Sequence, residues 1–283
     1  MKSYKLLVIG AFLTALSIVL PLTMPPAVQA QGNTPKEPLP VAVFQAAGAN
    51  AASIQSAVDA YRAALGNPNG NAAGPLASGR REIDWDGGGG VDTTTSPVTP
   101  FNVFLNTRGS QFTTPGIGLS QAPPSGGAQG GLVGLFGNTS YGTEFATFSP
   151  LRLFTPVGSN ITEALIFIPG TQGTVRATVN GFGAVFTDVD QPDGSGPGKK
   201  HGNRGASTLM EFFDLNGRLL FSSFVPASPG SGGLSFLGIK FNDARIASVR
   251  ITTGDSAPGP DDDEKHDIVM MDNFIYGEPQ ALP

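Results

Sequence analysis

The sequence predicts an all-β protein: an antiparallel β-sandwich, jelly-roll-like, with one N-terminal helix. Its 39 glycines and 24 prolines in 283 residues interrupt the backbone too often for long helices, while a hydrophobic content of 40% argues against disorder. Short runs of β-branched and aromatic residues follow one another after residue 100, each bounded by Gly, Pro, Asn or Asp. Strands without intervening helices favour antiparallel pairing in a sandwich, with a jelly-roll path as the expected version.

The N-terminus carries the features of a secretory signal peptide. Two lysines precede an apolar run at 6–20, which ends at Pro21, and Ala27-Val28-Gln29-Ala30 supplies a small-x-small cleavage pattern. The run is shorter than the roughly 20 apolar residues that a bilayer requires, which argues against the alternative of an uncleaved anchor. We therefore expect 1–30 to be a signal peptide, and the product to be secreted or periplasmic without a membrane span.

The next segment, 31–80, is predicted to be a flexible leader followed by an amphipathic helix. Residues 31–40 are polar and rich in proline, as linkers are. An apolar face at helical spacing is formed by Ile54, Val58, Tyr61 and Leu65. Asn50 or Ser53 is the expected N-cap and Gly66 the expected C-terminal residue, so the helix should pack this face on the main domain.

The rest of the chain, 81–283, is predicted to form one β-sandwich domain. Residues 80–86 alternate with period two and predict a strand that ends at a run of glycines. The further predicted strands are 101–105, 151–154, 162–168, 175–179, 182–188, 208–213, 218–225, 234–241, 246–252 and 268–276. Asn216-Gly217 is a hairpin signal, and the long loops 115–131 and 190–205 are the expected binding regions.

Aspartates are concentrated in three clusters at strand ends and in loops. These clusters are Asp84 with Asp86; Asp188, Asp190 and Asp193; and the acidic run 261–264. Residues i and i+2 of an extended chain point the same way, and Ca²⁺ takes about six to eight oxygen ligands from such loops. The pattern predicts a structural Ca²⁺ site, first at the second cluster and then at the first, whereas the third is better interpreted as a solvated acidic loop.

Asp272 is a separate case because it interrupts the apolar strand at 268–275. A carboxylate buried there needs hydrogen bonds or a cation, which makes Asp272 a further candidate metal ligand. The alternative is an outward-facing side chain on a half-solvated face, and the sequence leaves both interpretations open.

Most catalytic machinery is missing from the sequence. There is no cysteine, no Gly-x-Ser-x-Gly elbow and no phosphate-binding glycine motif, and His201 and His266 lie in polar loops. Glu144, Glu163 and Glu211 lie on or near predicted strands, and two such acids would suffice for glycoside cleavage. A polysaccharide-active hydrolase or lyase that uses Glu211 is therefore the rival hypothesis, and no residue is assigned a catalytic role.

Exposed aromatic side chains would distinguish a binding protein from the alternatives. Trp85, Tyr141 and Tyr276 are the candidates for ligand contacts. Trp85 lies between two aspartates on a predicted strand, so a role in the core is an equally good interpretation.

Several stretches together resemble the secreted β-sandwich domains of bacterial exosortase-sorted (PEP-CTERM) proteins, which are similar to lectin-like and carbohydrate-binding jelly rolls. The stretches are 181–190 (GFGAVFTDVD), 208–217 (TLMEFFDLNG), 234–239 (LSFLGI), 246–251 (IASVRI) and 269–274 (VMMDNF). The resemblance implies a structural Ca²⁺ held by Asp272, with Asp188 and Asp190 as further ligands. The end at 277–283 lacks the apolar segment and basic residues of a sorting tail, so anchoring is not expected.

These observations predict a secreted, non-catalytic β-sandwich protein, stabilised by Ca²⁺, that binds a glycan or another cell-surface or matrix component. The alternatives are the hydrolase or lyase and a structural protein of the envelope or matrix. Nucleic acid is not an expected partner because 22 acidic residues outnumber 17 basic ones.

Overall fold

The computed structural model describes residues 42–87, 92–127, 129–190, 208–228, 230–260 and 266–282, all within one compact unit. The predicted signal peptide, Asp193, His201 and the acidic run 261–264 lie outside these residues. Most of the regular secondary structure in the described residues is β-strand, and one long and three short helices accompany the strands.

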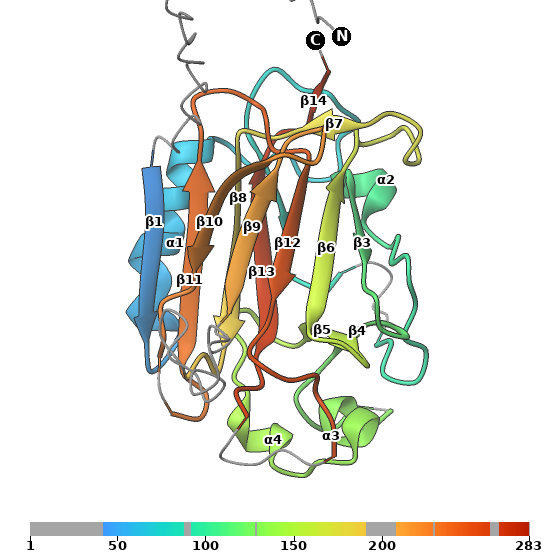
Figure 1. The fold of residues 1–283 in the computed structure, drawn as a ribbon, viewed down its shortest axis with the longest axis vertical. Coiled ribbons are helices and arrows are strands. Elements are labelled where there is room, and N and C mark those ends of the chain that lie inside the picture. The colour runs from blue at the N-terminus through green and yellow to red at the C-terminus, as the bar shows by residue number, and fades with distance from the viewer. Residues whose placement is uncertain are drawn as a thin grey trace, which may run out of the picture. The chain divides into compact units, whose positions relative to one another are not determined.

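Two antiparallel sheets make up most of the fold (Figure 1). The larger sheet contains, in spatial order, β1 (Ala42–Gly48), β11 (Leu234–Lys240), β8 (Gly181–Thr187), β13 (Met270–Gly277), β5 (Leu153–Val157) and β4 (Gly118–Ala122), and β2 (Arg80–Ile83) also pairs with β13. The smaller sheet contains β10 (Leu219–Phe224), β9 (Leu209–Phe213), β12 (Ser248–Thr252), β6 (Ile161–Ile166) and β3 (Ser110–Thr113). A short third pair joins β14 (Gln280–Ala281) to β7 (Ala177–Thr178).

The two large sheets pack face to face on a common apolar core. The larger sheet contributes residues such as Phe182, Phe186 and Leu237, and the smaller sheet contributes residues such as Phe212 and Val249. These side chains alternate along their strands with residues on the opposite faces, as period-two geometry requires. The predicted all-β antiparallel sandwich is therefore confirmed, while the jelly-roll path stays a prediction.

An aromatic cluster around Trp85 fills part of this core. The indole ring is stacked on Phe154 with centroids 3.7 Å apart. Phe101, Phe104, Phe112 and Phe274 approach the indole ring edge-on. The indole N–H donates to the carbonyl oxygen of Asp272 at 2.9 Å, so the polar atom of this buried ring is satisfied.

Helix α1 (Ala51–Leu65) forms a third layer on the outer face of the larger sheet. Its N-cap is Asn50, whose side chain accepts from the backbone N–H of Ser53, and its C-cap is Gly66. The helix approaches closely because glycines lie beneath it: a Cβ at Gly183 or Gly238 would come within about 3 Å of the Tyr61 ring. The predicted helix, its caps and its apolar face are confirmed.

Some predicted elements need correction. The run 101–105 is not a strand: Phe101 makes only an isolated bridge to Phe112, and α2 (Leu105–Arg108) begins where the strand was expected. The predicted loop 115–131 contains β4, whose sequence GLSQA has no alternating pattern because both of its faces are buried. Strands β1, β3 and β14, and the one-turn or two-turn helices α3 (Gly131–Phe136) and α4 (Tyr141–Glu144), were not predicted because they are too short or too weakly patterned.

A fully buried ion pair fastens the end of the chain to the loop after α1. Arg81 Nε donates to Glu278 Oε2 at 2.6 Å, and Arg81 Nη2 donates to Oε1 at 2.7 Å, with side-chain exposures of 0% and 1%. The remaining guanidinium nitrogen donates to the carbonyl oxygens of Gly70 and Ala72. Glu278 also accepts from Asn69 Nδ2, so both charges have several partners.

Candidate functional site

A cleft of about 880 Å³ opens beside helices α3 and α4, which lie beyond the ends of β4 and β5 (Figure 1). Its lining residues are Asp92, Pro123, Pro124, Ser125, Gly127, Gln129, Gly142, Phe145, Ala146, Thr147, Pro150, Leu151 and Arg152. The lining thus combines flat apolar surfaces with one carboxylate, one guanidinium, an amide and two hydroxyls. Such a surface suits a polar ligand that also has apolar faces.

Hydrogen bonds hold the walls of the cleft in place. Gln129 Oε1 accepts from the backbone N–H and the hydroxyl of Thr95 at 3.2 and 3.0 Å, and Asp92 Oδ1 accepts from the N–H of Thr94 at 2.9 Å. The bonds of Gln129 join the segment after residue 91 to the residues just before α3, and the bond of Asp92 holds the turn at 92–94. One side of the cleft is therefore built before any ligand binds.

Pro150, Leu151 and Arg152 of the lining belong to the segment 148–152, here called the 148–152 loop, and two aspartates hold this wall of the cleft. Asp86 Oδ1 accepts from the N–H groups of Leu151 and of Arg152, the latter at 2.9 Å. Asp272 Oδ2 accepts from the N–H of Phe148 at 2.6 Å and from that of Ser149 at 3.3 Å. Neither aspartate lines the cleft, yet together they fix the backbone of its wall.

The other carboxylate oxygens of both aspartates converge on one hydroxyl. Ser149 Oγ lies 3.5 Å from Asp86 Oδ2, 3.4 Å from Asp272 Oδ1, 3.4 Å from the carbonyl oxygen of Asp84 and 2.7 Å from Asn273 Oδ1. We call these five oxygens the oxygen cluster. A hydroxyl has one hydrogen and donates it to one partner at a time, so the cluster contains more acceptors than donors. Hard oxygens of this kind are the ligands that Ca²⁺ takes.

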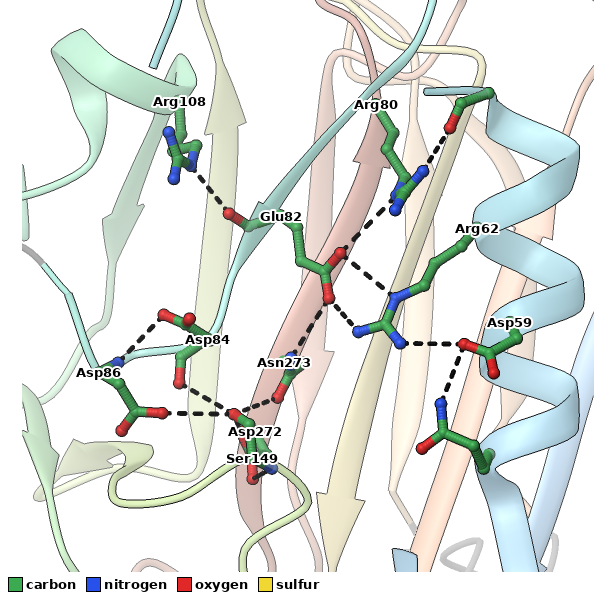
Figure 2. A network of polar contacts seen from close by, with 12 residues as sticks. Asp59, Arg62, Arg80, Glu82, Asp84, Asp86, Arg108, Ser149, Asp272 and Asn273 are labelled. Atoms are coloured by element: carbon green, nitrogen blue, oxygen red, sulfur yellow. Dashed lines mark hydrogen bonds and ion pairs between the residues drawn. The ribbon is translucent and has the colours of Figure 1, made fainter. Parts of the chain in front are cut away.

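A second set of contacts orients the oxygen cluster (Figure 2). Asn273 Nδ2 donates to Glu82 Oε1 at 3.3 Å, which turns the amide oxygen of Asn273 toward Ser149. Glu82 is in turn paired with Arg62 of α1 and with Arg80. The helix is thereby linked to the oxygen cluster through charged side chains.

Burial raises the pKa of Asp272 to about 8. The backbone N–H groups of Phe148, Ser149 and Asn273 act in the opposite direction and lower this pKa, whereas the charge of Asp86 raises it. The folded chain therefore holds this proton more tightly than the unfolded chain, whose ordinary value is 3.8. Its contribution to stability is complete below the ordinary pKa and is lost as the pH rises through about 8.

We accordingly expect the free energy of unfolding in EDTA to fall between about pH 4 and pH 8, measured by urea denaturation. Asp272→Asn is the matched control, because it keeps the acceptor for the loop but does not titrate. An equally steep fall in the variant would contradict the assignment to Asp272.

The other predicted metal ligands belong to a different network. The N–H of Asp190 donates to Asp267 Oδ1 at 3.3 Å, and Asp190 Oδ1 accepts from the N–H of Gly230. Asp188 is 5% exposed, with φ at 68°, and Asp193 is not described. Within the described residues, no three Asp, Glu, His or Cys side chains gather as a metal site, so any cation must rely on neutral oxygens as well.

The three candidate binding aromatics are not on the surface, and this expectation is corrected. Trp85, Tyr141 and Tyr276 all have 0% exposure. The hydroxyl of Tyr141 bonds to the backbone of Gly259, and that of Tyr276 donates to the carbonyl oxygen of Arg108. Each ring packs in an apolar cluster, so the core interpretation of Trp85 is the one that the structure supports.

The candidate acids do not form a catalytic pair. Arg250 lies between Glu163 and Glu211 in the register of the smaller sheet, and its Nη2 donates to Glu163 Oε1 at 2.6 Å. Glu144, the last residue of α4, accepts from the hydroxyl of Ser140, which immediately precedes the helix. His266 Nδ1 lies 2.9 Å from Ser256 Oγ and 3.5 Å from Asp255 Oδ1.

Sequence reasoning found Asp84, Asp86 and Asp272 but missed Ser149 and the cleft residues. Ser149 sits in an irregular stretch, and only the fold brings it to Asp86 and Asp272 from more than 60 residues away. Asn273 carried a signal, since an Asp-Asn pair in an apolar strand is unusual, but its partner Glu82 was not apparent.

No helix in the described ranges has the length and apolar content to cross a membrane. Comparisons with protein-family models, with curated proteins and with solved structures find no match to this chain.

Proposed function

We propose that this chain is a secreted, non-catalytic β-sandwich protein that binds a glycan of a cell surface or matrix in the cleft beside α3 and α4, with Ca²⁺ as a stabilising ion. The observation that carries the proposal is the cleft itself, whose volume of about 880 Å³ falls in the range of ligand sites. Its two walls are held by side-chain hydrogen bonds, which lowers the cost of ordering them around a ligand.

Glycan is the ligand class that this lining favours. A sugar ring presents hydroxyls around its edge and C–H groups on its faces. Arg152, Asp92 and Gln129 supply charged and amide groups for the hydroxyls, and Phe145 with Leu151 supplies apolar surface. Leu151 is 64% exposed, so apolar contact area remains available at the rim.

The test is binding to an array of neutral and acidic oligosaccharides, followed by calorimetry with the best binder. Thr147→Trp fills the cleft and Arg152→Ala removes its cation, and each is expected to lower affinity about tenfold or more. Arg250→Ala is the matched control, since it removes an arginine from the open face of the smaller sheet. Retained affinity in both cleft variants, or loss in the control, would contradict the assignment of the cleft.

Calcium enters the proposal through the oxygen cluster. Asp86, Asp272, Asn273 and the carbonyl of Asp84 would supply oxygen ligands. Because burial raises the pKa of Asp272 to about 8, binding of the cation would displace the proton of this carboxyl. The same carboxylates hold the 148–152 loop, so the ion would stabilise the wall of the cleft along with the fold.

Adding CaCl₂ in place of EDTA is expected to raise the melting temperature, with stabilisation of about 2.7 kcal/mol when Ca²⁺ is at 100 times its Kd. Asp86→Asn keeps an acceptor for the loop but removes a charge from the oxygen cluster, and should abolish the shift. Asp190→Asn, in the other network, should preserve it. An unchanged melting temperature of the unmodified chain would rule out the ion. If only Asp190→Asn abolished the rise in melting temperature, the ion would be assigned to the 188–193 cluster instead.

The rival hypothesis, a hydrolase or lyase, has no comparable support. Glu163 and Glu211 do not line the cleft, and Arg250 lies between them on the smaller sheet. The test of the rival is an assay for reducing ends or unsaturated products released from polysaccharides. Activity of the unmodified chain that Glu211→Gln abolishes would establish the rival.

A further inference from the structure

Strand β1 is the terminal strand of the larger sheet, and its outer edge is open in the part of the chain that the structure describes. It pairs with β11 in a continuous seven-residue register, from Ala42 opposite Lys240 to Gly48 opposite Leu234. Alternate residues of an edge strand direct their N–H and C=O groups away from the sheet. Among the described residues, only the carbonyl of Gly48 on β1 has a hydrogen bond outside this pairing, from the hydroxyl of Ser228.

The other edges of the two large sheets are protected. Strand β4 is covered by bonds from Thr93 and Val98, and β3 is bridged by Phe101. Strand β10 carries a register shift between Leu219 and Phe221, and such a bulge discourages further pairing. Proteins usually block exposed edges with charges, prolines or bulges, yet the sequence of β1, AVFQAAG, has none of these.

Strand β1 also extends beyond the smaller sheet. Its residues alternate in exposure, with Val43, Gln45 and Ala47 exposed on the side that faces the smaller sheet. The neighbouring positions Leu237 and Ile239 of β11 are fully buried in the core. The sandwich core therefore ends at β11. Strand β1 lies beyond the core, and the exposed side chains on this face of it are uncharged.

Helix α1 adds a second surface at the same edge. Its polar side, with Asp59 and Arg62, faces β2 through the pair with Glu82. The opposite side is formed by Ser53, Ala57, Ala60 and Ala64, at spacings of four, three and four residues. Ser53 lies against Gly48 of β1, which places this small-residue side toward the open edge.

We propose that β1 is a self-association surface, and that a second copy of this chain pairs its own β1 antiparallel to it. A two-fold axis normal to the sheet makes the pairing self-complementary and places both copies of α1 on the same face of one continuous sheet. The uncharged strand creates no like-charge contact in this arrangement. The small side chains on α1 permit the two helices to approach to the distance of packed helices.

A dimer of this kind carries two clefts. If the proposed function holds, the dimer can bind one polymeric surface through both clefts at once, which increases its overall affinity. The test of dimerisation needs no ligand, so it can fail independently of the proposed function.

Sedimentation velocity of the chain from residue 31 onward is the test, over concentrations of about 1 to 100 μM. The unmodified chain should sediment as a dimer. Gln45→Lys places two lysines opposite each other near the two-fold axis and should give a monomer with an unchanged far-ultraviolet circular dichroism spectrum. Ser222→Lys, an exposed position on the protected edge strand β10, is the control that should remain dimeric.

A second pair of variants tests the contribution of the helix. Ala64→Glu lies on the side toward β1 and should raise the dimer dissociation constant about tenfold or more, whereas Ala63→Glu points to solvent and should leave it unchanged. A monomer at every concentration would overturn the proposal, as would a dimer that survives Gln45→Lys. A monomer whose β1 edge binds an extended peptide would assign the edge to a different partner and overturn it too.

Discussion

Glu278→Ala is expected to lower the free energy of unfolding by about 3–5 kcal/mol, because it leaves the guanidinium of Arg81 charged and buried without its counter-ion. The pair has almost no solvent exposure, so water cannot replace the lost carboxylate. The same change removes the acceptor for Asn69 and for the N–H of Leu76, and so loosens the segment 66–79. Urea denaturation followed by circular dichroism measures the effect.

The exposed pair of Arg250 and Glu163 provides the comparison, with side-chain exposures of 45% and 37%. Glu163→Ala should cost less than about 1 kcal/mol, as surface ion pairs do. The double variant Arg81→Met with Glu278→Leu should recover part of the loss, because no charge stays buried. If Glu278→Ala and Glu163→Ala lowered the free energy of unfolding by the same amount, the proposed stabilising role of the buried ion pair would be contradicted.

Trp85→Ala is the second change with a large expected effect, about 3–5 kcal/mol of destabilisation. It removes the ring at the centre of the aromatic cluster and leaves a cavity among five phenylalanines. It also removes the donor to the carbonyl of Asp272, in the strand that carries the oxygen cluster. Thermal and urea unfolding, followed by far-ultraviolet circular dichroism, report the loss.

Two further variants separate packing from the hydrogen bond. Trp85→Phe keeps an aromatic ring but no N–H, so its cost should be intermediate. Phe221→Ala, a partly buried ring at the edge of the core, should cost clearly less than Trp85→Ala. If Trp85→Ala left the free energy of unfolding nearly unchanged, the assignment of the ring to the centre of the core would be contradicted, and a role in surface contacts would again be considered.

The elements that the sequence predicts well are those with a strong local pattern. Helix α1 has an apolar face, an asparagine cap and a terminal glycine, and the hairpin between β9 and β10 has Asn216-Gly217 at its turn. Strand β4 and helix α2 lack such a pattern, because one is buried on both faces and the other is a single turn. In both cases, tertiary contacts decide the local structure.

In the candidate site, too, the sequence identifies some residues, whereas only the fold reveals their partners. Asp86 was a candidate because it and Asp84 point the same way on an extended chain, and Asp272 because it interrupts an apolar strand. Their real partners, the N–H groups of the 148–152 loop, come from a segment without any motif. For the aromatic candidates, the sequence left the exposure of Trp85 open, and packing buries it together with Tyr141 and Tyr276.

Hydrogen–deuterium exchange with and without the oligosaccharide that binds best on the array is the most direct test of the proposed binding site. Binding in the cleft predicts slower exchange in 123–127 and 142–152, with little change across β6, β9 and β12. Protection confined to those three strands of the smaller sheet, with the cleft segments unchanged, would contradict the assignment.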